Sequence, residues 1–525
     1  MPIATELPID STATALAMAN EIFGTGITVN SASYSGDALS SGIYTFGDTI
    51  SPDATPGDTG VILSTGYVAD FTNNSGTTNT NTATNTSTNT SGVNNDADFN
   101  AIAGAGTRDA SFLEIDFTPQ GDTITIDFVL SSEEFPEYIN SAFNDVIGVW
   151  VNGVEATVTI GDGSASIGNI NGDDTGNIYN DNTGDQFNTE MDGFTVTLTF
   201  VAPVTPNAVN TLKIGVADVG DSSYDTNLLI AGGSVQSTII ALDDQISMPT
   251  DKTRTLDVLD NDSSTGGTLT VTHINGTAVV AGDTVTLASG QDITLNADGT
   301  FSIDSDGDSE TVYFNYSIAD TSGNTDTALV EIEQIPCFVK GSLIETPKGP
   351  VKIEALSAGM KVLTRDDGPK TIRWIGQRTV AAHGPNRPIR IRKGQFGATR
   401  DLLLSPQHRV LVENSWAELL FGEAEVLVKA KDLINDLHIR PDDELSSVTY
   451  FHILFDSHQI ITANGVASES YLPGACTMKG FDPQTQAEIL DLFPGLDSDG
   501  LGYGPAARPM LKGREAVSLL AAIAA

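Results

Sequence analysis

The chain has 525 residues, and its 69 Asp and Glu against 25 Lys and Arg give it a formal net charge of −44. The imbalance lies in residues 1–336, which contain 47 Asp and Glu and 4 Lys and Arg, whereas residues 337–525 contain 22 and 21. So acidic a front part repels phosphates and argues against nucleic-acid binding, and because no apolar run reaches about 18 residues, the sequence predicts no membrane-spanning helix.

The two ends of the chain bear on export. The first twenty residues, MPIATELPIDSTATALAMAN, contain no Lys or Arg and no clean apolar segment, so they do not resemble a conventional signal peptide. The chain closes on the small apolar stretch GREAVSLLAAIAA. The front half is rich in Thr, Asn, Asp and Gly, as exported bacterial β-proteins are. Together with this tail, that composition predicts an extracellular or cell-surface protein without a classical N-terminal signal peptide, exported by its C-terminus as in type I secretion. The alternative for the tail is a helix that packs on the module before it.

Residues 1–236 predict an antiparallel β-sandwich. Segments such as SFLEIDFTP, DTITIDFVL, DVIGVWVNG and NTLKIGVADV alternate apolar and polar residues and are separated by Gly, Asn and Asp clusters. The Asn/Thr-rich residues 73–99 cannot form a core and predict a mobile surface loop. The stretches TGVILSTG and FVLSSEEFPEYINSAFNDVIGVWVNG resemble the choice-of-anchor L family of bacterial surface and secreted proteins, a likeness that implies no reaction.

Four acids in this region admit two interpretations. Glu133, Glu134, Glu137 and Asp145 have the chemistry of paired catalytic acids or of a cation site. The alternative is that SEEFPEY forms a solvated turn, which its Phe and Tyr anchor to the sandwich. We prefer this turn to a catalytic or cation site.

Residues 240–334 predict a second β unit. The segments LDVLDND, NADGTF and YSIADTSGNTDTALVEI resemble a cadherin-like or VCBS-type repeat of bacterial adhesins. The resemblance implies calcium between neighbouring domains, held here by Asp244, Asp260, Asp262 and Asp320. The alternative is Asx-turn chemistry, in which Asp bonds its own backbone. No complete EF-hand loop is present in the sequence.

Residues 337–474 contain the chemistry of a protein that cuts its own backbone. Cys337 is a potential nucleophile directly after a candidate scissile bond, Pro336–Cys337, and Ser405 and His408 form a Ser-x-x-His turn in LLLSPQHRVLV. These residues and the stretch CFVKGSLIETPKGPVKIEALSAGMKVLT resemble the Hint (hedgehog/intein) self-processing module, which implies an all-β horseshoe.

In this resemblance Cys337 attacks the carbonyl of Pro336 and gives a thioester by an N–S acyl shift. His408 moves the proton, Ser405 holds the scissile group, and water or an amine then releases or couples residues 1–336. The reaction requires no cofactor. The alternatives are a buried small hydrophobe for Cys337 and a core histidine for His408.

Departures from the family pattern limit the reaction. Glu469 and Ser470 occupy the places of the intein His-Asn pair, so neither splicing nor C-terminal cleavage is expected. Gln377 and Arg378 stand where hedgehog modules carry their sterol-activating Asp, which argues against sterol transfer. His458 corresponds to the later His of the family and is a secondary candidate.

Two functions remain for an all-β multidomain chain that ends in a helical tail, residues 475–525. The first is a secreted protein whose Hint module cleaves itself at Pro336–Cys337. The alternative is a calcium-stabilised adhesive or structural protein with an inactive Hint fold. A cell-surface or matrix partner, or an amine that resolves the thioester, fits these functions, but the sequence identifies none.

Overall fold

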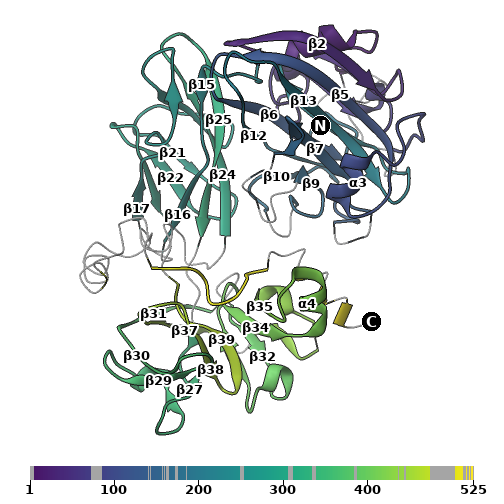
Figure 1. The fold of residues 1–525 in the computed structure, drawn as a ribbon. Helices are drawn as coiled ribbons and strands as arrows, with labels where there is room; N and C mark the ends of the chain where they lie inside the picture. The colour runs from purple at the N-terminus through teal and green to yellow at the C-terminus, as the bar shows by residue number, and fades with distance from the viewer. Residues whose placement is uncertain are drawn as a thin grey trace.

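The structure is a computed structural model in which three β-rich units follow one another along the chain. Figure 1 shows the first two units side by side and the third beneath them. No helix among the described residues is long and apolar enough to cross a membrane. The residues outside the described part are 1–4, 73–85, 140, 142, 157, 159, 161–164, 172–174, 185, 249–252, 305–310, 334–337, 383–386, 436, 443–444, 473–492, 494–502, 512–515, 517–518, 521 and 524–525.

The first unit is the predicted sandwich. In β5, Leu113, Ile115 and Phe117 are buried while Glu114 between them is exposed, because successive side chains of a strand point to opposite faces. The inward face packs in one core with Phe128 of the opposing sheet.

One sheet has the strand order β1 (Ile9–Asp10), β3 (Ser41–Thr45), β4 (Thr59–Ser64), β14 (Thr226–Ala231), β6 (Thr123–Ser132), β11 (Gly193–Thr195) and β10 (Tyr179–Asp181), with β12 (Leu198–Pro203) also paired to β6. The other has the order β2 (Ile27–Ser35), β5 (Thr107–Pro119), β13 (Asn210–Val219), β7 (Val146–Val151) and β8 (Val154–Glu155), with β9 (Ala165–Ser166) also paired to β7. The helices of this unit are α1 (Ala15–Ile22), α2 (Gly47–Ile50), η1 (Val68–Phe71) and α3 (Ala97–Ala103).

The SEEFPEY turn is more deeply buried than predicted. Glu133 is 2% and Glu134 1% exposed, so the prediction of a solvated turn is wrong for these two acids. Glu137 is exposed, and Phe135 is fully buried as the predicted anchor. The burial arises because the turn closes one end of the sandwich, which the local sequence does not reveal.

Part of the predicted Asn/Thr-rich loop is described, and it is hydrogen-bonded. Thr86 N–H donates to Glu133 Oε1 at 3.0 Å, and Thr88 N–H donates to Asp225 Oδ1 at 2.7 Å. Asp96 then caps α3 with its side chain. Residues 73–85 lie outside the described part. Residues 86–96 therefore form a strap over the sandwich end, because their backbone donors meet buried carboxylates.

The second unit is a smaller two-sheet sandwich around its own core. Its strands are β15 (Ile239–Ile240) paired with β18 (Ser263–Ser264); the sheet β16 (Asp244–Ser247), β25 (Thr325–Glu333), β24 (Thr311–Ala319), β19 (Thr270–Ile274) and β20 (Thr277–Ala278); and the sheet β17 (Thr253–Leu256), β23 (Phe301–Asp304), β22 (Asp292–Leu295) and β21 (Thr284–Thr286). The pair β16–β25 is parallel and the others are antiparallel.

The first two units share a hydrogen-bonded interface, at which β12 lies beside β25 (Figure 1). Asn315 Nδ2 donates to the Thr197 carbonyl at 2.7 Å, and the Thr199 hydroxyl lies 2.7 Å from the Thr327 carbonyl. The Gln236 amide also bonds a carbonyl of β25. Several direct contacts between the units predict that they move as one body.

The third unit is mainly β, as predicted, with a few short helical segments. One sheet has the order β31 (Trp374–Ala381), β37 (Ser447–Leu454), β26 (Phe338–Val339), β33 (Leu402–Leu404), β32 (Ile389–Ile391) and β36 (Ile439–Pro441). The other has the order β28 (Val351–Lys352), β27 (Leu343–Ile344), β38 (Ile460–Ala463), β39 (Val466–Glu469), β34 (Arg409–Glu413) and β35 (Glu425–Lys429), with β29 (Lys361–Thr364) paired to β38 and to β30 (Gly368–Thr371). The helical segments are η2 (Ile353–Ala355), η4 (Gln395–Gly397), α4 (Ser415–Phe421) and η5 (Lys431–Leu433).

The predicted helical tail differs from the structure over residues 503–511. This segment is extended, and its Met510 bridges Leu427 of β35. Pro505 and Pro509 interrupt any helix here because proline lacks the N–H that helical bonding needs. Residues 516, 519, 520, 522 and 523 are helical. The sequence DPQTQAEILDLFPGL also predicts a short helix, but only its Phe493 is described, and Phe493 is not helical.

Candidate functional site

The Ser-x-x-His turn joins β33 to β34 in the third unit. His408 N–H donates to the Ser405 carbonyl at 3.1 Å and closes the turn. Two backbone bonds from the next segment hold it in place, from Ala430 N–H to His408 O at 2.9 Å and from Lys431 N–H to Pro406 O at 3.0 Å. Ser405 is 1% and His408 2% exposed. The turn is therefore rigid, and both predicted site residues lie inside the protein.

The His408 imidazole is buried and neutral. Neither ring nitrogen has a hydrogen-bond partner among the described residues. Burial, with a smaller contribution from the positive charge of Arg409 and of His452 and His458, lowers the pKa of His408 to about 3. The ring is thus neutral at neutral pH. A buried imidazole with both nitrogens open is typical of a group that bonds a reacting molecule or segment.

The start of the unit lies against this histidine. Phe338 pairs with Leu404 of β33 and with Phe451 of β37, so β26 runs between them. Its ring contacts the His408 ring, with centroids 4.3 Å apart. Phe338 follows Cys337 directly in the chain, whereas Cys337 and Pro336 themselves lie outside the described residues.

His458 has a full set of partners. Its Nδ1 accepts a bond from Ala507 N–H at 3.0 Å, and its Nε2 lies 3.1 Å from the Ser470 carbonyl. The acceptor role of Nδ1 places the proton on Nε2, which then donates to Ser470. Burial lowers the pKa of His458 to about 4. These bonds tie the tail segment to β38 and β39, which is a structural role.

An ion pair between Glu469 and Arg409 lies beside the turn. Glu469 Oε1 accepts a bond from Arg409 N–H at 2.9 Å and lies 3.5 Å from Arg409 Nη1. Its Oε2 lies 3.6 Å from His458 Nε2. The sequence points to this pair only in that Glu469 stands in the place of the intein His. In the structure, the Glu469 carboxylate pairs with Arg409.

The predicted calcium ligands of the second unit make two kinds of hydrogen bond: Asp244 and Asp262 contact a tyrosine hydroxyl, and Asp320 accepts bonds from backbone N–H groups. Asp244 and Asp262 share the Tyr316 hydroxyl, which lies 2.9 Å from Asp244 Oδ2 and 3.2 Å from Asp262 Oδ2. Burial, with a smaller contribution from the charges of Asp262 and Asp260, raises the pKa of Asp244 to about 8. Asp320 instead accepts backbone bonds from the turn that follows it, at 2.8 and 3.0 Å, as an Asx turn does.

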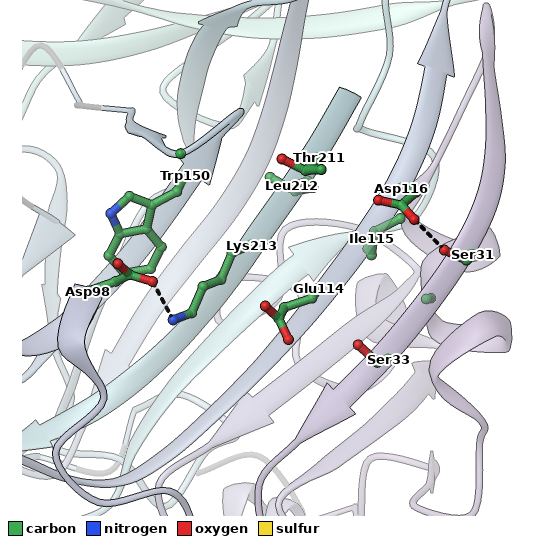
Figure 2. A pocket seen from close by; sticks show the side chains of 12 residues that line it. Ser31, Ser33, Asp98, Glu114, Ile115, Asp116, Trp150, Thr211, Leu212 and Lys213 are labelled. Atoms are coloured by element: carbon green, nitrogen blue, oxygen red, sulfur yellow. Dashed lines mark hydrogen bonds and ion pairs between the residues drawn. The ribbon is translucent and has the colours of Figure 1, made fainter. Parts of the chain in front are cut away.

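A polar cavity of about 480 Å³ lies on the solvent-facing side of the first unit (Figure 2). Figure 2 shows Lys213 on β13 reaching toward Asp98, with Glu114 on the neighbouring strand. Lys213 Nζ lies 2.7 Å from both Asp96 and Asp98 and 4.5 Å from the centroid of the Phe112 ring. The cation is satisfied by these contacts, so it serves to hold α3 on the sheet.

Comparison with protein families agrees with this division of the chain. Residues 8–236 match the family model of the Choice-of-anchor L domain, residues 236–333 that of a bacterial Ig domain, and residues 336–475 that of the Hint domain. The second unit is therefore Ig-like, and the calcium role implied by its cadherin-like resemblance stays a prediction.

Similar solved structures include the solution structure of a bacterial intein-like domain from Clostridium thermocellum, at 17% identity over 26% of this chain and 97% of that chain, with a TM-score of 0.18. The crystal structure of gp41-1 intein matches at 10% identity over 25% of this chain and 97% of that chain, with a TM-score of 0.17. A comparison with curated proteins gave no significant match. The assignments above rest on the family models.

Proposed function

We propose that the chain is a surface-associated or secreted protein whose Hint region cuts its own backbone at Pro336–Cys337. The observation that carries the proposal is the buried His408 with two open ring nitrogens, in contact with the residue that follows Cys337. A self-processing function at the level of the Hint family agrees with this arrangement.

The proposed steps balance as follows. An unassisted thiol with a pKa of about 8.5 is mostly protonated at neutral pH. The neutral His408 takes the proton from Cys337 Sγ as the sulfur attacks the Pro336 carbonyl carbon, because burial keeps the pKa of the imidazole too low for a separate imidazolium to form first. The C–N bond then breaks, and His408 returns the proton to the departing Cys337 nitrogen. A thioester and a free amine result. Ser405, in the same turn, supplies a hydroxyl to the scissile group.

Water or an amine then attacks the thioester and regenerates the Cys337 thiol. Water leaves a carboxylate at Pro336, and an amine leaves an amide. In either case the Choice-of-anchor L and Ig-like regions separate from the Hint region. Glu469 in the place of the intein His, held by Arg409, supports cleavage without splicing.

Export fits the same proposal. The Choice-of-anchor L match suggests a surface-associated protein, and we propose that the C-terminus carries the export signal, as in type I secretion. The Hint region would then detach from an exported front part.

The thioester is the intermediate to trap. Incubation of the full chain with hydroxylamine is expected to give a fragment ending in a Pro336 hydroxamate, identified by mass spectrometry, because hydroxylamine attacks thioesters far faster than amides. A Cys337→Ser chain provides the control, since its ester forms and cleaves more slowly. Cleavage elsewhere, or equal yield from Cys337→Ala, would contradict the mechanism.

A further inference from the structure

One polar side chain of the Ser-x-x-His turn has no part in the proposed cleavage steps. Gln407 directly precedes His408, and only 3% of it is exposed. Its Oε1 has no hydrogen-bond partner among the described residues. Glutamine is mostly an exposed residue, and a buried amide that lacks a partner lowers stability. The amide of Gln407 is therefore expected to make a bond that offsets this cost.

The amide nitrogen of Gln407 contacts the Ig-like domain. Its Nε2 donates to the Thr311 hydroxyl at 3.3 Å. Thr311 is the first residue of β24 in the Ig-like domain and lies 96 positions earlier in the chain. Figure 1 shows the Hint region below the Ig-like domain, on the side where β24 and β25 have their lower ends. The turn that holds His408 thus touches the preceding domain through the neighbouring side chain.

Thr311 lies opposite the last strand residue before the candidate scissile bond. It pairs with Glu333 at the end of β25. Four residues separate Glu333 from Phe338, whose ring contacts His408. Because Gln407 and His408 are adjacent, one turn contacts the elements that flank the candidate scissile bond on both sides.

The turn does not need the Gln407 side chain for its own fold. Three backbone hydrogen bonds hold it, one within the turn and two from the segment that follows β35. None of the three involves a side chain. The bond from Gln407 to Thr311 therefore serves the contact between the two domains.

The placement of the Ig-like domain matters for the proposed cleavage because the two sides of the scissile bond belong to different domains. Pro336 follows β25 of the Ig-like domain, whereas Cys337 precedes β26 of the Hint region. The connection from Glu333 to Phe338 spans at most about 18 Å, which limits the distance between the domains but not their orientation. A misplacement of about 1 Å lowers a reaction rate by up to about 10²-fold.

We propose that Gln407 is a positioning residue that docks the Ig-like domain on the Ser-x-x-His turn, so that cleavage requires the folded Ig-like domain as a partner. The inference rests on the proposed self-cleavage. Gln407 transfers no proton and forms no covalent bond. Through Thr311 it holds the Pro336 side of the scissile bond in place relative to His408.

The contact also suits a reaction that ends in separation. A single neutral hydrogen bond contributes little net free energy in water, and the covalent connection supplies the effective concentration of one domain at the other. Cleavage removes this connection. The docking of the Ig-like domain is therefore expected to weaken once the bond is cut, which favours release of the front part.

Timed mass spectrometry of the full chain tests the proposal with closely matched variants. Thr311→Val keeps the branched shape but removes the hydroxyl, and we expect cleavage to slow about tenfold. Thr311→Ser keeps the hydroxyl and should cleave at the parental rate. Gln407→Met removes the amide and should slow cleavage by a similar factor. The double variant should be no slower than Gln407→Met, because both changes break the same bond.

A second measurement does not depend on cleavage. In the Cys337→Ala chain, which keeps the two domains joined, Thr311→Val should speed hydrogen exchange in the peptide that contains residues 405–412. Thr311→Ser should leave this exchange unchanged. Thr311 lies outside the Hint region, so an effect on the turn reports the contact between the domains and not a misfolded Hint region.

The outcomes separate this proposal from self-cleavage itself. Parental cleavage by Thr311→Val, or additive slowing in the double variant, would overturn the positioning role and leave self-cleavage standing. A parent chain that stays full length would overturn self-cleavage and the positioning role together. Unchanged exchange in Thr311→Val would overturn the docking. If Gln407→Met does not fold, the Thr311 variants still decide the outcome, because they leave the Hint region unaltered.

Discussion

Buried acidic residues have different neighbours in the Hint region and in the Choice-of-anchor L region. In the Hint region, Glu469 lies beside Arg409, and Asp442, 2% exposed, is bonded by the Arg390 guanidinium. Among the described residues of this region, the buried acids Glu469 and Asp442 each have an arginine on a strand of the same sheet. Residues 337–525 contain nearly equal numbers of acidic and basic residues, and these buried acids form ion pairs with arginines.

In the front region the acids meet one another instead. Glu134 and Asp145 lie close to further acids at the strand ends, and Asp127 faces Asp326 across the interface with the Ig-like unit. The difference shows that net charge separates the two regions chemically: buried acids are paired with cations in the Hint region, whereas burial and neighbouring acids raise the pKa of the buried acids in the front region.

The largest expected effect concerns His408, whose two ring nitrogens have no hydrogen-bond partner among the described residues. His408→Ala should slow cleavage by about 10²–10⁴-fold, the usual contribution of a general acid–base group. The exposed His438→Ala is the matched control and should cleave at the parental rate, as measured by mass spectrometry of timed samples. Equal rates in the two variants would remove His408 from the mechanism.

The pH dependence of the cleavage rate also tests the role of His408. Because burial holds the pKa of His408 near 3, the imidazole stays the neutral base throughout pH 5–8. The cleavage rate should therefore show no inflection near 6.5, the ordinary value for histidine. An inflection there would mean that the reacting histidine is solvated.

Breaking a buried pair tests the paired region. Glu469→Gln should lower the free energy of unfolding of the Hint region by about 2–3 kcal/mol, because Arg409 would lose its buried counter-charge. Glu413→Gln removes an exposed partner of Arg365 and should cost no more than about 1 kcal/mol. Urea unfolding compares the two, and equal losses would contradict the distinction between them.

The unpaired region should respond to pH at the domain interface. Burial raises the pKa of Asp127 and of Asp326, so the folded protein binds more protons than the unfolded chain above pH 4. Stability should fall by at least ~1 kcal/mol as pH rises from 4 to 7. Asp326→Asn should flatten this fall, whereas a parental slope in the variant would exclude the pair as its source.

The smallest effect is expected at Lys213, which is the one basic residue among those lining the cavity in Figure 2. Lys213→Met keeps the apolar stem over Phe112 but removes the ion pairs with Asp96 and Asp98. We expect a loss of about 1–2 kcal/mol in the free energy of unfolding. Asp98→Asn, which leaves Asp96 in place, should lose less, and a larger loss would contradict this ranking.

The sequence predicted the parts of this protein that local patterns encode. Alternation in segments such as SFLEIDFTP predicted the strands, and the Ser-x-x-His motif predicted that Ser405 and His408 share a turn. Burial of Glu133 and Glu134 was not predictable in this way, because it arises where four distant strand ends meet. The extended tail was missed because its partner, β35, lies about eighty residues earlier.

The most direct test of the account is the intact mass of the full chain, incubated with and without dithiothreitol, beside Cys337→Ala. The account predicts two fragments that meet at Pro336 and Cys337, faster with thiol and absent in the variant. A single full-length mass under every condition would contradict self-cleavage and leave a surface protein with an inactive Hint fold.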